Sequence, residues 1–305
     1  MTRRTFITVF LVIVTGATAA LWTPDHDRTL LESRYLQSLT DLRVIDDVSL
    51  HVRDDGPRSA PALILLHGLG SSLHTWEPWA NALASEFRVI RFDLPGSGLS
   101  APDPGGDYTD ARSHELLVAL LDSLGVTRAT LIGNSMGGRI AWSFAERYPD
   151  RVDKLVLISP DGFASPGFAY DQPAEVPASL SLLRYALPKW ILRKSLEPAY
   201  ANGDRLADSI VTRYHDLLLA PGARDAMLQR LRQTVLTDPL PRLARIVAPT
   251  LIVWGEGDAM IPVSNAADYI GAIRGARLVT LPGIGHVPFE EAPSVSLDAV
   301  RTFLR

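Results

Sequence analysis

Three residues that lie far apart in the sequence have the types that nucleophilic catalysis needs. Ser135 stands at the centre of a Gly-x-Ser-x-Gly pattern, Asp258 follows an apolar run, and His286 lies in a glycine-rich turn. A serine hydroxyl is a poor nucleophile at neutral pH, so it needs a base within hydrogen-bond reach and an acid that orients the base. Serine, aspartate and histidine in this order therefore indicate acyl transfer through an activated serine.

The sequence around Ser135 predicts a strand that turns directly into a helix. Residues 128–132 form a short apolar run typical of a buried strand, and residues 136–148 place apolar side chains at helical spacing. So sharp a turn forces its central residue into a strained backbone conformation, and glycines two residues before and after it let strand and helix pack closely. We therefore expect the Ser135 hydroxyl at the carboxyl edge of a sheet.

Asp258 and His286 are expected at the same edge. The apolar runs 250–255 and 277–281 predict two further strands, and each run ends shortly before one of these two side chains. The carboxyl ends of neighbouring parallel strands meet at one edge of a sheet, where ligands bind. The prediction is that Ser135, Asp258 and His286 converge there.

Other titratable residues offer alternatives for the acid and the base. Asp161 also follows an expected strand and is a rival acid, and Glu256 is a weaker one. Asp93 is a third candidate, although such a residue more often holds a glycine-rich loop by accepting backbone N–H bonds. His114 and His215 fall on expected helices and are interpreted as surface or lid residues.

The negative charge that develops in acyl transfer needs hydrogen-bond donors. Met136 begins the expected helix, where a backbone amide can point at an anion. The loop His67-Gly68-Leu69-Gly70 leaves another strand end and can supply the Leu69 amide, whereas His67 itself is interpreted as structural. One such donor lowers the barrier by about 3–4 kcal/mol.

The order of the expected elements indicates an α/β fold with one insertion. Residues 41–53 alternate apolar and polar side chains, which predicts an antiparallel hairpin. Strands and helices then alternate in residues 41–160 and 247–305, as in a parallel sheet covered by helices on both faces. Residues 161–246 are helical and rich in proline, and we interpret them as a lid over the sheet edge.

The composition excludes several classes of function. The chain has 305 residues and a net charge of −4, with 47% hydrophobic residues and no cysteine. The scattered cations form no stripe that would indicate a nucleic-acid partner. Without cysteine there are no disulfides, no thiolate chemistry and no cysteine-based zinc site.

The N-terminal residues 1–22 resemble an export signal or a membrane anchor. Arg3 and Arg4 precede the uncharged run 6–21, which is somewhat shorter than the roughly 20 residues of a membrane span. Cleavage after a small residue and retention as an anchor are both open, and either predicts an exported or membrane-associated protein. Residues 23–40 are interpreted as a polar linker with a short helix, outside the catalytic argument.

Five short motifs occur together in an order typical of one family. They are His67-Gly68, Asp93-x-x-Gly96-x-Gly98-x-Ser100, Gly133-x-Ser135-x-Gly137, Gly255-x-x-Asp258 and Gly285-His286. With these motifs the chain resembles the α/β-hydrolase superfamily from the first hairpin to the last helix. The resemblance implies a mostly parallel, eight-stranded sheet flanked by helices, with a helical lid.

The resemblance also implies roles for residues. Ser135 would be the nucleophile, His286 the base and Asp258 the acid, with the Leu69 and Met136 amides as the oxyanion hole. Neither a metal ion nor an organic cofactor is implied.

The substrate stays open at this stage. Hydrolysis of a small hydrophobic carboxylic ester, as in esterases and lipases, is the least demanding interpretation. The elbow Gly-Asn-Ser-Met-Gly-Gly is shared with C–C hydrolases of meta-cleavage products, which usually carry a tryptophan where this chain has Val287. Hydrolysis of a lactone or an amide on the same triad is another alternative, and a non-catalytic binding member of the fold is a further one.

Overall fold

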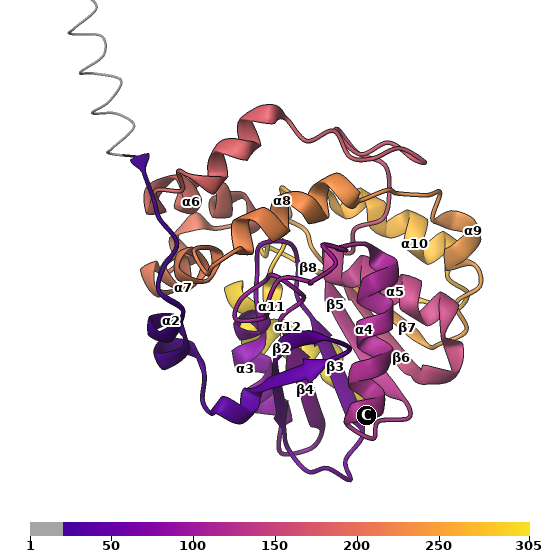
Figure 1. The fold of residues 1–305 in the computed structure, drawn as a ribbon. Helices are drawn as coiled ribbons and strands as arrows, with labels where there is room; N and C mark the ends of the chain where they lie inside the picture. The colour runs from indigo at the N-terminus through magenta and orange to yellow at the C-terminus, as the bar shows by residue number, and fades with distance from the viewer. Residues whose placement is uncertain (1–20) are drawn as a thin grey trace, which may run out of the picture.

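The computed structural model describes residues 21–305 and contains one eight-stranded sheet (Figure 1). The strand order is β1-β2-β4-β3-β5-β6-β7-β8, with β1 and β2 antiparallel to their neighbours and all later pairs parallel. The predicted α/β-hydrolase fold with a mostly parallel sheet is therefore confirmed. The strands are β1 Leu42–Ile45, β2 Val48–Asp55, β3 Ala62–Leu66, β4 Arg88–Phe92, β5 Ala129–Asn134, β6 Val152–Ile158, β7 Thr250–Gly255 and β8 Arg277–Leu281.

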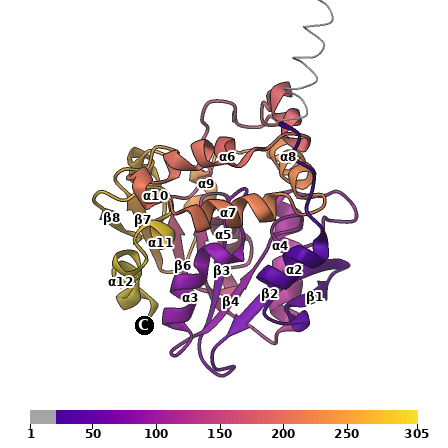
Figure 2. The ribbon, with the colours of Figure 1, turned by 90° about the vertical axis from the view of Figure 1, so that its left-hand side faces the viewer.

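Helices cover both faces of the sheet, as Figure 2 shows from the side. One apolar layer is formed with α4, α5 and α10, and the other with α3, α11 and α12. Central strands such as β3 and β5 are buried along their whole length, which explains their continuous apolar sequence. These helices are α3 Glu77–Leu83, α4 Asp110–Ser123, α5 Met136–Arg147, α10 Ala266–Ala272, α11 Pro288–Glu291 and α12 Pro293–Leu304.

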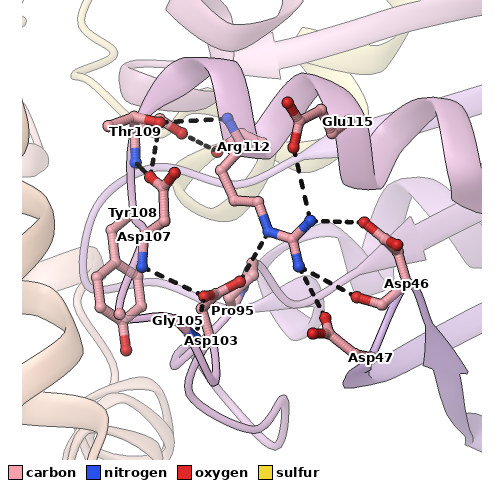
Figure 3. A network of polar contacts seen from close by, with 12 residues as sticks. Asp46, Asp47, Pro95, Asp103, Gly105, Asp107, Tyr108, Thr109, Arg112 and Glu115 are labelled. Atoms are coloured by element: carbon pink, nitrogen blue, oxygen red, sulfur yellow. Dashed lines mark hydrogen bonds and ion pairs between the residues drawn. The ribbon is translucent and has the colours of Figure 1, made fainter.

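The β1–β2 hairpin is fixed to the sheet-covering helix α4 by one arginine (Figure 3). Arg112 Nε donates to Asp103 Oδ2 at 2.8 Å, and its two terminal nitrogens reach Asp46 and Asp47 in the hairpin turn. Both turn residues have positive φ, which aspartate tolerates better than most residues. One planar guanidinium thus joins the hairpin, the loop before α4 and α4 itself.

A helical insertion connects β6 to β7 and lies over one end of the sheet (Figures 1 and 2). Its first part, residues 163–186, contains no buried residue, whereas α7 and α8 contain five each. The insertion helices are α6 Lys189–Leu196, α7 Asp208–Leu218, α8 Ala223–Gln233 and α9 Leu240–Leu243, with short 3₁₀ turns at Ala178–Arg184, Glu197–Ala199 and Gly203–Arg205.

The start of the described chain packs on this insertion rather than forming a free linker. The short helix predicted in this region is α2, Arg28–Tyr35. The Thr23 amide donates to Tyr185 O at 2.8 Å, and Arg224 Nη1 donates to Thr23 O at 2.8 Å. No local pattern predicts this packing, because Tyr185 and Arg224 lie more than 150 residues away from Thr23.

The predicted signal or anchor, residues 1–22, lies outside the described residues except for its last two. Within residues 21–305, no helix has the length and apolar character needed to span a bilayer.

Candidate active site

Ser135 occupies the predicted sharp turn between β5 and α5. Its φ of 54° and ψ of −123° are strained for a residue with a side chain. A Cβ atom on Gly137 would lie 2.3 Å from Leu66 O, so only glycine lets helix and strand approach this closely. The turn holds the Ser135 hydroxyl at the carboxyl end of β5.

His286 and Asp258 are brought together from the ends of β8 and β7. His286 Nδ1 lies 2.8 Å from Asp258 Oδ2, and both side chains are buried. The other carboxylate oxygen accepts the amides of Met260 and Ile261, each at 2.8 Å, which fixes the orientation of the carboxylate. With a carboxylate as acceptor, Nδ1 carries the proton and Nε2 is left free to accept one.

Ser135 and His286 line one cavity of about 300 Å³. Among the described residues no hydrogen bond joins the Ser135 hydroxyl to His286, and such bonds are often long before substrate binds. Much of the cavity wall is apolar, and its apolar side chains include Phe168, Leu196, Leu231, Met260, Ile261 and Val287.

The rival acids have other partners. Asp161 also lines the cavity, but its Oδ2 lies 3.5 Å from Arg139 Nε. Glu256 accepts a hydrogen bond from the Thr280 hydroxyl in an exposed position. Neither carboxylate is hydrogen-bonded to His286 in the described part of the chain.

Asp93 holds its glycine-rich loop. Its carboxylate accepts the amides of Leu73 at 2.6 Å and Leu99 at 2.9 Å, and it contacts His51 Nδ1 at 2.8 Å. Burial alone would raise the pKa of Asp93, but the charge and hydrogen bond of His51 outweigh burial and lower the pKa to about 2. These contacts agree with the loop-holding role expected for Asp93.

The Leu69 and Met136 residues both line the cavity beside Ser135. Met136 is the first residue of α5, so its amide has no acceptor within the helix. His67 is buried, with Nδ1 2.8 Å from Gly68 O and Nε2 accepting from the Leu94 amide at 3.0 Å. Burial lowers the pKa of His67, which keeps the ring neutral and structural, as expected.

Comparison with known proteins assigns the chain to a family. The family model described as alpha/beta hydrolase fold matches residues 61–293. The chain belongs to the α/β-hydrolase family.

Several members of this family resemble the chain over most of its length. It is 30% identical to 2-hydroxy-6-oxo-6-phenylhexa-2,4-dienoate hydrolase of Comamonas testosteroni, over 86% of this chain and 93% of that protein. A crystal structure of a hydrolase from Pseudomonas aeruginosa PA01 is 32% identical, with a TM-score of 0.75 over 86% of this chain and 97% of the other. A membrane phospholipase A, described as a bacterial virulence factor, is 25% identical, with a TM-score of 0.74 over 99% and 98% of the two chains. Family and relatives mark this chain as a hydrolase of small molecules.

Asn134 is a site residue of this α/β-hydrolase that sequence reasoning missed. Its side-chain amide donates to Ile158 O at 3.1 Å and to His286 O at 3.0 Å. The residue before Ser135 therefore ties the loop that carries His286 to the turn that carries Ser135. Its place inside the elbow motif was the one available signal.

Glu291 is a second missed residue. Its buried carboxylate accepts the Gly285 amide at 2.6 Å, just before His286, and the Ala201 and Asn202 amides of the insertion at 3.2 and 3.1 Å. One carboxylate thus positions the histidine loop against the insertion. Because its three donors come from two distant loops, no local pattern reveals this role.

The interpretation of His114 as a surface or lid residue is wrong. The side chain is buried between α4 and α5, and its Nε2 lies 2.9 Å from the Ser143 hydroxyl. Burial lowers the pKa of His114 to about 4, so the ring is neutral at pH 7. His215 does lie on the insertion, on α7, where its Nε2 contacts Leu187 O.

Proposed function

We propose that this α/β-hydrolase cleaves carboxylic esters through a triad of Ser135, His286 and Asp258. The observation that carries the proposal is the 2.8 Å hydrogen bond between Asp258 and His286 at the wall of the cavity that Ser135 also lines. Nucleophile, base and acid then stand in the order that acyl transfer requires.

The proposed reaction has two halves, acylation of Ser135 and hydrolysis of the acyl-serine, and the same side chains act in both. Asp258 holds the Nδ1–H of His286, so that Nε2 takes the Ser135 proton while Oγ attacks the ester carbonyl. The Leu69 and Met136 amides stabilise the oxyanion, and His286 then gives the proton to the departing alcohol. Water attacks the acyl-serine by the same route and releases the acid. No step calls for a metal ion or an organic cofactor.

The nature of the cavity supports a hydrophobic ester. Its volume of about 300 Å³ and its mostly apolar walls suit a small to medium acyl or aryl group. We assign the insertion, residues 161–246, the role of a lid, because α6 and α8 contribute Leu196 and Leu231 to these walls. The likeness to a membrane phospholipase A over 99% of the chain supports an exported or membrane-associated protein.

Covalent labelling tests the nucleophile directly. A fluorophosphonate probe should label Ser135, and turnover of p-nitrophenyl butyrate should fall at least about 10⁴-fold in Ser135→Ala. Ser195→Ala is the matched control, because Ser195 lines the same cavity and bonds to Leu192 O. Ester turnover that survives in folded Ser135→Ala protein would sink the proposal.

Hydrolysis of a C–C bond is the second candidate, favoured by the 30% identical dienoate hydrolase. A dienoate brings a carboxylate, and Arg139 is the cation that lines the cavity. However, Arg139 already faces Asp110 at 3.4 Å and Asp161 at 3.5 Å, so a third carboxylate would be repelled. We therefore rank the ester first. The ratio of kcat/KM for p-nitrophenyl butyrate, a lactone, an anilide and the dienoate decides between them.

A further inference from the structure

Exposed apolar side chains gather where the N-terminal segment meets the insertion. We call this the aromatic patch, and two of its three aromatic members, Trp22 and Tyr185, stack with ring centroids 5.8 Å apart. A solvent-exposed stack of this kind is unusual on a surface that faces only water. The patch consists of Leu21, Trp22, Leu182, Tyr185 and Trp190, which are 40–65% exposed.

Hydrogen bonds fix the point where the N-terminal segment leaves the folded part. The Thr23 amide donates to Tyr185 O at 2.8 Å, and the Thr23 hydroxyl accepts the Leu187 amide at 3.1 Å. Figures 1 and 2 show this start of the described chain on the insertion, at the opposite end of the molecule from the C-terminus. The uncharged run 6–21 therefore continues directly from the aromatic patch.

The segment that carries three of the five patch residues is basic in sequence. Residues 176–196 contain four Lys or Arg and no Asp or Glu, in a chain whose net charge is −4. Arg184, Arg193 and Lys194 face single carboxylates of neighbouring segments, and Lys189 donates to the Thr212 hydroxyl. Tryptophan and tyrosine favour the interface between lipid and water, and nearby cations favour anionic headgroups.

We propose that the aromatic patch docks on the surface of an anionic lipid bilayer. The uncharged run that ends at Leu21 and the absence of acidic residues in 176–196 favour lipid over a second copy of the chain. The helix α6 carries Trp190 near its start and lines the cavity with Ser195 and Leu196 near its end. Docking thus places a cavity wall next to the bilayer, which deepens the proposed function and rests on it: the ester would be lipid-borne.

The chain's own tryptophans test the docking. Of the six tryptophans, only Trp22 and Trp190 are exposed to solvent. The other four are at most 2% exposed: Trp76, Trp79, Trp142 and Trp254. Vesicles of phosphatidylcholine and phosphatidylglycerol with brominated acyl chains should quench up to about a third of the emission of the full-length chain, since two of six tryptophans are exposed. Vesicles without bromine are the control for binding alone.

Single substitutions separate docking from tethering. If the patch docks, Trp190→Phe lowers the quenched emission by about half, because Trp22 and Trp190 then report equally. If Trp22→Phe removes all quenching and Trp190→Phe removes none, the chain is only tethered through its N-terminus and the proposal is overturned. A concentration-dependent dimer that Trp190→Glu disrupts, with no quenching by vesicles, would assign the patch to a second copy instead.

Activity gives an independent measurement. In Trp190→Glu, turnover of a phospholipid ester in vesicles should fall about tenfold, whereas turnover of soluble p-nitrophenyl butyrate should stay unchanged. Leu39→Glu, which changes an exposed leucine away from the patch, should alter neither. Normal quenching without any ester turnover would reject the proposed reaction but would still support docking of the aromatic patch on lipid. Equal vesicle turnover in wild type and Trp190→Glu would reject the docking.

Discussion

The sheet and the first part of the insertion are built in opposite ways. In β3, β4, β5 and β7 every residue is buried, whereas residues 163–186 of the insertion contain none that is. The proposed triad comes entirely from turns at the ends of sheet strands, and the insertion contributes walls to the cavity. The chemistry is thus assigned to turns held by packing, and selectivity to the insertion, whose first part has few buried contacts and should open most easily.

The largest expected difference between the two regions is in kcat, when the candidate acids Asp258 and Asp161 are replaced in turn. Asp258→Asn should lower kcat for p-nitrophenyl butyrate by about 10⁴-fold, because His286 loses the partner that fixes its tautomer. Asp161→Asn, at the junction with the insertion, should change kcat less than tenfold, since Asp161 pairs with Arg139. Steady-state kinetics with circular dichroism as the folding control measures both. A larger loss in Asp161→Asn would reverse the assignment of the acid.

The next largest expected difference between the two regions is in stability. Leu131→Ala removes a fully buried side chain from β5 and should lower the free energy of unfolding by about 2–5 kcal/mol. Leu182→Ala removes a side chain that is 63% exposed and should change it by less than about 0.5 kcal/mol. Urea unfolding followed by fluorescence gives both values. Similar losses would show that residues 163–186 are held as firmly as the sheet.

Selectivity should respond to changes in the insertion. Leu231→Trp on α8 narrows the cavity and should lower kcat/KM for a long-chain ester about 10- to 100-fold relative to acetate. Leu240→Trp is the control, because this half-exposed leucine of the insertion does not line the cavity. A p-nitrophenyl chain-length series makes the measurement. If Leu231→Trp has the same chain-length preference as the wild type, the lid does not determine specificity.

The smallest expected effect, taken per pH unit, is on the pH dependence of stability. His114 has a folded pKa of about 4, against about 6.5 in the unfolded chain, so the unfolded state binds an extra proton between these values. Stability should therefore fall as the pH drops from about 6.5 to about 4, by roughly 1 kcal/mol per pH unit for this histidine. His114→Gln should flatten that slope in urea unfolding series. His215→Gln, in the half-buried insertion site, should flatten it less.

Much of the fold followed from local patterns. Apolar runs without alternation identified the strands that are buried on both faces, and the hairpin alternation identified β1 and β2. The glycine spacing around Ser135 predicted a strained turn, and the positive φ is present. Each of these features depends on neighbours within a few residues, which is why sequence reasoning reached them.

The contacts that were missed join distant residues. Asn134 bonds to the carbonyl of His286, 152 positions away, and Tyr35 bonds to Asp216 across 181 positions. Sequence reasoning placed His114 on a helix, but it could not show that this side chain packs between α4 and α5. The periodicity of apolar residues does not predict which distant polar groups will form hydrogen bonds.

The carboxylate of Glu291 has a consequence for how such enzymes diverge. It holds the turn before His286 and the 201–202 stretch of the insertion with one side chain. An insertion transplanted from a relative would therefore disturb His286, the proposed base, unless its backbone amides bonded to Glu291 in the same way. The contacts of Glu291 therefore limit which insertions can be exchanged by recombination. Substitution of side chains along α8 is not limited in this way.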